Sequence, residues 1–351
     1  MALVQVQELP GGRVLFGPGA LARVPEESSN LGMTAVVLVA SGSAKPHADE
    51  LAAALGRRLA ARIDGVAQHV PEQLAAEALR LAGEAGADGL VSIGGGSATG
   101  LAKAVARGTG APILAVPTTY AGSEMTPVWG ITAGGRKTTG RDPKVRPRTV
   151  VYDPLLTVSM PPSVTAASGM NAAAHCATTL ASGAAGPLDA LFAEQGLRAL
   201  AASLPACVEV PGDLAARQEA LRGAWLAGLS LAGAGAGLHH RACHVLGGGF
   251  GLPHAEVHAA VLPHAVALGA DPGGLARVAS ALGAEDAPGG LWDLARRTGA
   301  TQGLRQLGLG TDDLDAATEQ VAAANPSHPH AAIAQLLRMA YEGRRPAPST
   351  R

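Results

Sequence analysis

The chain has 351 residues, 47% of them hydrophobic, with 27 lysines and arginines against 28 acidic residues and a formal net charge of -1. This length allows two domains with buried cores, and the balanced charge gives no overall attraction to nucleic acid or to an anionic membrane. The amino-terminal residues show no basic segment followed by an apolar one, and Cys176, Cys207 and Cys243 form no paired motif. We therefore expect a cytoplasmic protein that neither binds nucleic acid nor enters a membrane.

The first half of the chain alternates β-branched segments with amphipathic segments rich in alanine and leucine. The β-branched segments are residues 35–39, 89–93, 113–116 and 149–152, and the helical patterns are residues 50–61, 74–84 and 99–106. Such alternation predicts a parallel sheet covered by helices. After Asp153 and Pro154 only helical patterns follow. We predict an α/β domain over residues 1–155, an all-helical domain over residues 156–351 and a ligand site between them.

A glycine-rich turn joins the predicted strand 89–93 to the next helix. Residues 94–100 read GGGSATG. Glycines let a backbone approach an anion closely, and the amino end of a helix attracts phosphate through its free amides and its dipole. The segment matches neither GxGxxG nor GxxxxGK[ST]. From these residues alone, phosphate binding and a tight strand-to-helix turn are equally good interpretations.

Histidines gather in the second half, where six of the 11 lie between residues 239 and 264. His240 and His244 are four residues apart, as are Asn171 and His175, so each pair shares one face of a predicted helix. Imidazoles bind metal ions, donate hydrogen bonds to an oxyanion and transfer protons near neutral pH. We interpret four as functional: His175, His240, His244 and His254. A structural role is the better interpretation for three others: His239, His258 and His264.

Positive charge gathers between residues 134 and 148. This segment has one acidic residue, Asp142, and six basic ones: Arg136, Lys137, Arg141, Lys144, Arg146 and Arg148. A solvated loop is the usual role of such a segment. The functional alternative is capture of an anionic substrate or a cofactor phosphate, because guanidinium groups match carboxylates and lysine supplies a point charge. The residues alone leave both alternatives open.

In this order, the segments resemble the iron-containing alcohol dehydrogenase superfamily. The matching motifs are GGGSATGLAKA (94–104), PTTYAGSEMTP (117–127), YDP (152–154) and HHRACHVLGGGFGLPH (239–254). The longer segments PTTYAGSEMTPVWGIT, GGRKTTGRDPKVRPRTVVYDP and ASGMNAAAHC are similar to its maleylacetate reductase branch. The resemblance implies an α/β Rossmann-like amino-terminal domain and an all-α carboxyl-terminal domain, the fold shared with dehydroquinate synthase. It also implies NADH or NADPH as cofactor and a homodimer.

The resemblance assigns eight positions to the cofactor. They are Ser41, Gly95, Gly96, Ser97, Thr118, Thr119, Ser123 and Lys137. The glycines and Ser97 would hold the pyrophosphate, the threonines and Ser123 would line the nicotinamide, and Lys137 matches a lysine near the cofactor. Ser41 stands where the family often carries an Asp for the adenosine ribose. Without that carboxylate a 2′-phosphate is not repelled, so both NADH and NADPH would serve.

The metal site of the superfamily consists of one Asp and three His, and this chain departs from it. His175, His240 and His254 match the histidines, whereas Asn171 stands at the Asp position, as in maleylacetate reductases. Loss of the only anionic ligand weakens the binding of a hard divalent ion. We therefore predict that no metal is required. His244 matches a histidine close to the reacting carbon.

The resemblance implies NAD(P)H-dependent reduction of the conjugated C=C bond of maleylacetate, or a substituted analogue, to 3-oxoadipate in aromatic compound degradation. The substrate is a small dicarboxylate, and we expect its contacts at Tyr120, Arg136, Arg141 and, where its role is not purely structural, His239. His240, His254 and Asn171 would stabilise an enolate, and His244 would protonate the carbon. The family usually has an aromatic residue and an Arg where residues 327–330 read SHPH. A metal-dependent alcohol or polyol dehydrogenase is the alternative.

Overall fold

The computed structural model describes residues 4–67, 70–134, 136–233, 237–268, 271–300 and 303–347. The chain divides into two compact units, Met1–Met160 and Pro161–Arg351. The sequence placed this boundary near residue 155, whereas the first unit also contains the 3-10 helix Pro154–Thr157. Asp153 connects this turn to the rest of the unit, because its carboxylate accepts hydrogen bonds from the backbone amides of Leu21 and Leu155.

The first unit is built on a seven-stranded sheet. Its strands are β1 (Gln5–Leu9), β2 (Gly12–Phe16), β3 (Val36–Ala40), β4 (Leu59–Ile63), β5 (Gly89–Gly94), β6 (Ile113–Pro117) and β9 (Thr149–Tyr152). Their order is β1-β2-β9-β6-β5-β3-β4, and all pairings are parallel except that of β1 with β2. The parallel sheet predicted from the alternating pattern is confirmed.

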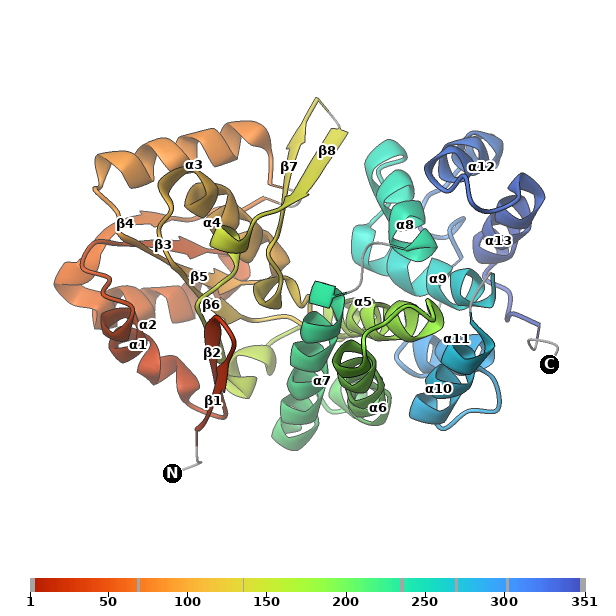
Figure 1. Cartoon of the computed structure of the whole chain (residues 1–351), viewed down its shortest axis with the longest axis horizontal. Coiled ribbons are helices and arrows are strands. Elements are labelled where there is room, and N and C mark those ends of the chain that lie inside the picture. The colour runs from red at the N-terminus through yellow and green to blue at the C-terminus, as the bar shows by residue number, and fades with distance from the viewer. Residues whose placement is uncertain are drawn as a thin grey trace. The chain divides into compact units, whose positions relative to one another are not determined.

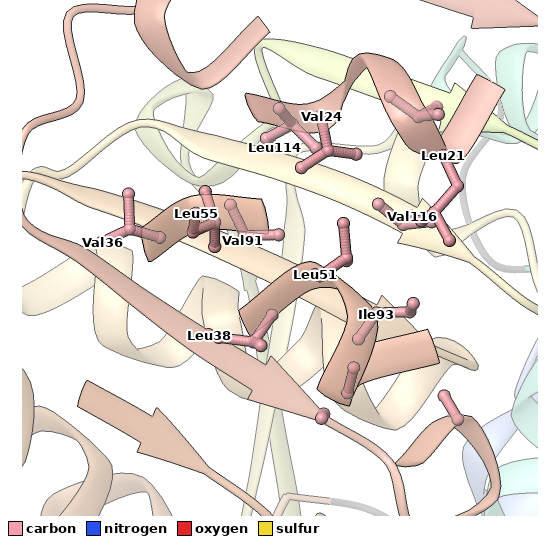
Figure 2. Close-up of a cluster of buried hydrophobic side chains, with 14 of the residues drawn as sticks. Leu21, Val24, Val36, Leu38, Leu51, Leu55, Val91, Ile93, Leu114 and Val116 are labelled. Carbon is pink, nitrogen blue, oxygen red and sulfur yellow. The ribbon is translucent and has the colours of Figure 1, made fainter. Parts of the chain in front are cut away.

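Helices cover both faces of this sheet (Figure 1). They are α1 (Val24–Asn30), α2 (Lys45–Leu55), α3 (Glu72–Glu84) and α4 (Gly96–Thr109). Successive residues of a strand point to opposite faces. Val36 and Leu38 of β3 therefore pack with Leu51 of α2 in one core (Figure 2), whereas Val37 and Val39 pack with α3 and α4 in the other. Further 3-10 helices are Ala20–Arg23, Gly42–Ala44, Gly56–Arg58, Ser123–Met125 and Pro143–Val145.

Two predictions for the first unit were wrong. The helix expected over residues 50–61 ends at Leu55, where Gly56 follows with φ 55°, and Leu59–Ile63 forms the edge strand β4. The basic segment 134–148, expected as a loop, contains a strand over Arg136–Arg141. Strands β7 (Val128–Ala133) and β8 (Arg136–Arg141) pair antiparallel as a separate two-stranded sheet (Figure 1). The β1–β2 hairpin was not predicted from the sequence.

The described part of the second unit contains helices and no strands. They are α5 (Pro162–Ala181), α6 (Pro187–Glu209), α7 (Leu214–Gly233), α8 (Leu238–Gly249), α9 (His254–Ala267), α10 (Pro272–Leu282), α11 (Ala287–Arg297), α12 (Asp313–Ala324) and α13 (His330–Glu342). A Cβ on Gly196 of α6 would lie 3.2 Å from the carbonyl oxygen of Gly223 on α7, so these helices approach closely. The predicted fold class, an α/β domain followed by an all-α domain, is confirmed. None of the helices described here is both long and apolar enough to span a membrane.

Candidate active site

The carboxyl ends of β3, β5 and β6 bring together most of the predicted cofactor residues. The backbone amide of Ser41, after β3, donates to the carbonyl of Ile93 in β5 at 3.0 Å. The amide of Thr118, after β6, donates to the carbonyl of Gly94 at 2.9 Å. Neighbouring parallel strands end at the same edge of a sheet, where open α/β folds bind nucleotides. Ser41, the glycine turn and the Thr118 segment therefore form one continuous edge.

Neighbouring side chains approach the backbone of the glycine turn closely. Gly94 has φ 145°, and a Cβ there would lie 2.5 Å from the hydroxyl oxygen of Ser41. A Cβ on Gly96 would lie 3.2 Å from the Cβ of Ala121. Helix α4 begins at Gly96, and its N-cap residue Gly95 has no side chain to cap the free amides. We name Gly95, Gly96 and Ser97 the phosphate cradle, because free amides and a bare backbone let an anion approach.

Lys103 of α4 fixes the loop that follows β6, and the sequence analysis did not single it out. Its side chain is fully buried, and its ammonium group donates to the Ser123 carbonyl at 2.6 Å, Thr126 Oγ1 at 3.0 Å and the Val128 carbonyl at 2.9 Å. Burial lowers the pKa of Lys103 to about 7, against the opposing effect of the Glu124 charge. The signal in the sequence was a lysine within the apolar segment 101–106 of a predicted helix. Lys103 thus holds Ser123, a predicted nicotinamide contact.

Glu124 fastens the same loop from the side of β9. Its buried carboxyl accepts a hydrogen bond of 2.7 Å from the hydroxyl of Tyr152, and burial raises the pKa of both groups. Tyr120, a predicted substrate contact, is also fully buried. This burial does not favour direct contact between Tyr120 and a substrate.

The β7–β8 hairpin arranges the predicted anion-binding residues along one face. Residues two apart in a strand point to the same side, so Lys137, Thr139 and Arg141 of β8 share a face. All three residues are exposed, but the Lys137 amine is partly covered, and this burial lowers its pKa. We name them the basic face of the hairpin. Arg136 pairs with Ala133 at the end of the ladder, and its side chain lies outside the described part of the structure.

Helices α5 and α8 bring His175 and His240 into contact. Both side chains are buried, and His240 Nε2 lies 2.8 Å from His175 Nδ1. Their rings stack with centroids 4.8 Å apart and an interplanar angle of 7°. The two helices thus direct imidazoles at one point, as their four-residue spacings suggested.

His239 and His258 extend this group. The buried Nε2 of His239 donates to the carbonyl of His258 at 3.1 Å, which makes Nδ1 of His239 the unprotonated nitrogen. Burial lowers the pKa of His239 to about 4, so its ring is neutral at pH 7. Ligand nitrogens of His239, His240 and His258 lie within 4.8 Å of one another, close enough to suggest a metal site. The sequence analysis favoured a structural role for His258, and its only signal was membership of the histidine group.

The other predicted catalytic residues differ in exposure. Asn171 lies one turn before His175 on α5, and its Oδ1 is buried without a hydrogen-bond partner in the described residues. His244 lies one turn after His240 on α8 and is exposed. His254 is the first residue of α9, and its side chain lies outside the described residues.

A contact with α12 fixes the orientation of α8. Arg241 Nε donates to Oδ1 of Asn325 at 2.8 Å, and the Asn325 amide donates to the carbonyl of Val321. Asn325 is fully buried and lies two residues before the segment 327–330, which differs from the family pattern. Within that segment, His330 is exposed and contacts Glu319 at 2.9 Å. Asn325 thus helps to hold α8, the helix that carries His240 and His244, whereas His330 is exposed on the surface.

Comparison with known proteins covers nearly the whole chain. Family models match residues 11–154 (Iron-containing alcohol dehydrogenase) and residues 165–341 (Fe-containing alcohol dehydrogenase family, C-terminal). A maleylacetate reductase of Burkholderia cepacia is 46% identical over 343 residues, 95% of this chain and 97% of that protein. Crystal structures of maleylacetate reductases from Agrobacterium tumefaciens and Rhizobium sp. strain MTP-10005 each superpose with a TM-score of 0.90, at 41% and 42% identity. Each covers 99% of this chain and 100% of its own. The family inferred from the motifs is therefore confirmed, and this chain belongs to the iron-containing alcohol dehydrogenase family.

Proposed function

We propose that this chain is an NAD(P)H-dependent oxidoreductase that reduces the conjugated C=C bond of maleylacetate, or of a substituted analogue, to give 3-oxoadipate. The observation that carries the proposal is the 46% identity to a maleylacetate reductase over 95% of the chain. The structure adds support, because an amide, Asn171, lies one turn from His175 where an alcohol dehydrogenase would carry a carboxylate. We also propose that this reaction is a step in the degradation of aromatic compounds.

The phosphate cradle fits the pyrophosphate of a dinucleotide, since a Cβ on Gly96 would fill the space beside Ala121. We assign Thr118, Thr119 and Ser123 to the nicotinamide side. Ser41 has no charge that repels a 2′-phosphate, so both NADH and NADPH serve. When bound, the reduced nicotinamide supplies the hydride. Side chains of the protein carry out the two remaining steps, which are stabilisation of the enolate and protonation of the carbon.

Hydride addition to the alkene carbon remote from the ketone leaves a negative charge on the ketone oxygen as an enolate. Hydrogen-bond donors placed at that oxygen lower the barrier. We assign this role to the Asn171 amide and to His240 and His254. The exposed His244 then delivers a proton to the other alkene carbon, which completes the reduction. His175 contacts His240 at 2.8 Å and thereby orients its ring.

A divalent metal is not assigned a step in this reaction. The family name includes iron, which does not support the expectation of a metal-free enzyme. His175, His240 and His254 would hold an ion at the family position, and His239, His240 and His258 form the other candidate set. Both sets consist of imidazoles, which carry no negative charge, and Asn171 adds an uncharged amide. Because neither set includes an anionic ligand, we propose that metal binding is weak and that activity does not depend on it.

Chelation should therefore leave activity intact. After dialysis against EDTA, the rate of NADH oxidation with maleylacetate should be unchanged and metal analysis should find less than one ion per chain. Asn171→Asp should raise metal affinity, because it restores a negative ligand beside the histidines, and should create weak alcohol oxidation. Activity that disappears with EDTA and returns with one particular divalent ion would show the metal-free proposal to be wrong and would favour a metal-dependent alcohol or polyol dehydrogenase.

The direct test of the proposed function is a spectrophotometric screen of NADH and NADPH oxidation. Maleylacetate and substituted analogues should be consumed with equal amounts of reduced cofactor, and 3-oxoadipate should form. Simple aldehydes and ketones should react far more slowly. An enzyme that reduces only aldehydes or ketones would contradict the proposal. We also propose a homodimer, which light scattering after size-exclusion chromatography measures.

The basic face should contribute to substrate capture through its charge. Arg141→Ala should raise the KM for maleylacetate roughly 10- to 100-fold, equivalent to losing a charge-assisted contact of about 1.5–3 kcal/mol, and should spare cofactor affinity. For the native enzyme, kcat/KM should fall with ionic strength, because the Debye length shrinks to roughly 8 Å at physiological salt.

The neutral diester of the substrate provides the control for this variant. It lacks the carboxylates, so its KM should change little with Arg141→Ala or with salt. Equal losses for diester and diacid would assign Arg141 to hairpin structure and move substrate recognition to other residues.

A further inference from the structure

Two cations on one face of α4 hold the root of the hairpin. Lys103 and Arg107 lie four residues apart and so point the same way from the helix. The Lys103 ammonium donates to the carbonyl of Val128 at 2.9 Å, and the guanidinium of Arg107 lies 3.9 Å from the ring centroid of the next residue, Trp129. The first two residues of β7 are thus fixed to the helix that begins with the phosphate cradle.

The hairpin has a helix-facing side and an opposite side. Trp129 pairs with Gly140, where a Cβ would lie 2.6 Å from the indole ring, so the ring packs against the bare backbone of β8. Ile131, two residues on, packs on the core formed by β3, α3 and α4. Arg141 pairs with Val128, the residue before Trp129, so the side chains of the basic face and the Trp129 ring lie on opposite sides of the hairpin. The basic face therefore points away from α4.

We propose that Lys103 and Arg107 are positioning residues that set the basic face at a fixed place relative to the phosphate cradle. Through α4, the element that holds the cofactor pyrophosphate also aims the side chains that attract the substrate carboxylates. This inference rests on the proposed function, which identifies the anion at the basic face as the dicarboxylate substrate. The attachment of the hairpin to α4 itself rests on the contacts of Val128, Trp129 and Gly140.

Arg107 is the better residue to test, because it is exposed and its loss leaves the core intact. An exposed cation–π contact of this kind is worth about two- to fivefold in an equilibrium constant. In Arg107→Met, amide hydrogen exchange of β7 and β8 should accelerate by about two- to fivefold, while exchange in the main sheet stays unchanged. The KM for maleylacetate should rise by a similar factor, with kcat unchanged.

A matched control separates position from charge. Arg80 on α3 is also exposed and pairs with Glu84, so Arg80→Met removes the same charge but leaves the contact with Trp129 in place, and it should change neither measurement. Arg107→Lys keeps a cation and should restore part of the native KM. In Gly140→Ala the added methyl group displaces the Trp129 ring and should reproduce the faster exchange.

The outcomes distinguish this inference from the proposed function. Unchanged hairpin exchange in Arg107→Met, or an equal rise of KM in Arg80→Met, would overturn the positioning role. A native enzyme that does not reduce maleylacetate would remove the proposed function, yet hairpin exchange would still report on the attachment to α4. A KM that rises equally for the neutral diester would show that Arg107 acts on something other than the basic face.

Discussion

Gly96→Asp should weaken the binding of NADH and NADPH by about 100-fold or more, since it exchanges a favourable phosphate contact of about 1.5–3 kcal/mol for repulsion between two anions. Gly96 is the first residue of α4, where a carboxylate interacts favourably with the helix dipole. The fold should therefore survive, although the Cβ must fit 3.2 Å from Ala121. Fluorescence titration measures the affinity, and the thermal midpoint should stay within a few degrees of the native value.

Gly96→Asn is the matched control, because it adds nearly the same volume without the charge. Its affinity should lie between those of the native protein and Gly96→Asp. If the two variants lose the same affinity, crowding by the side chain rather than charge is responsible. A native affinity in Gly96→Asp would place the pyrophosphate elsewhere.

His244→Asn should lower kcat by about 10²–10⁴-fold, the usual contribution of a positioned proton donor. Asparagine has a similar size and polarity but cannot deliver a proton near neutral pH. His244 is exposed on α8, so its replacement should leave the core of the unit and the cofactor affinity unchanged. Pre-steady-state kinetics in H₂O and D₂O would assign the loss to the proton-transfer step, and added imidazole should restore part of the rate.

His330→Asn serves as the control for this loss, because His330 is also an exposed histidine and contacts Glu319 on the surface. It should keep the native kcat. A His244→Asn enzyme with native kcat would mean that water or another side chain protonates the product. We would then assign His244 to binding, provided that its KM had risen.

The sequence predicted the central sheet because β-branched segments buried on both faces have few other stable arrangements. It placed the glycine turn correctly for the same reason, since the turn follows directly from β5. The end of α2 was missed because Leu59–Ile63 carries alanines and arginines typical of a helix, and Gly56 alone signals the change. The β7–β8 hairpin was not predicted because its strands carry Gly130, Gly140 and basic residues, which strands usually lack.

Long-range contacts in the candidate site were harder to predict. The spacing of Asn171 and His175 defined a helix face, but the contact of His175 with His240 depends on how α5 and α8 pack. Lys103 was missed because a charged residue in an alanine-rich helix normally reaches solvent. Here four oxygens of Ser123, Thr126 and Val128 surround its ammonium group instead. Such partners are distant in sequence, and only the folded chain brings them together.

The close approach of α6 and α7 limits how the helical unit can assemble. Gly196 and Gly223 each face the backbone carbonyl of the other, where an added Cβ would lie 3.2 and 3.1 Å away. Turning α6 by one residue replaces Gly196 at this crossing with Gln195 or Leu197, and turning α7 replaces Gly223 with Arg222 or Ala224. Each of these residues carries a Cβ, which would force the backbones apart. The two glycines therefore fix the register in which α6 packs against α7. They add little contact area of their own. They nevertheless disfavour other registers of α6 against α7, which alanine-rich helices would otherwise allow.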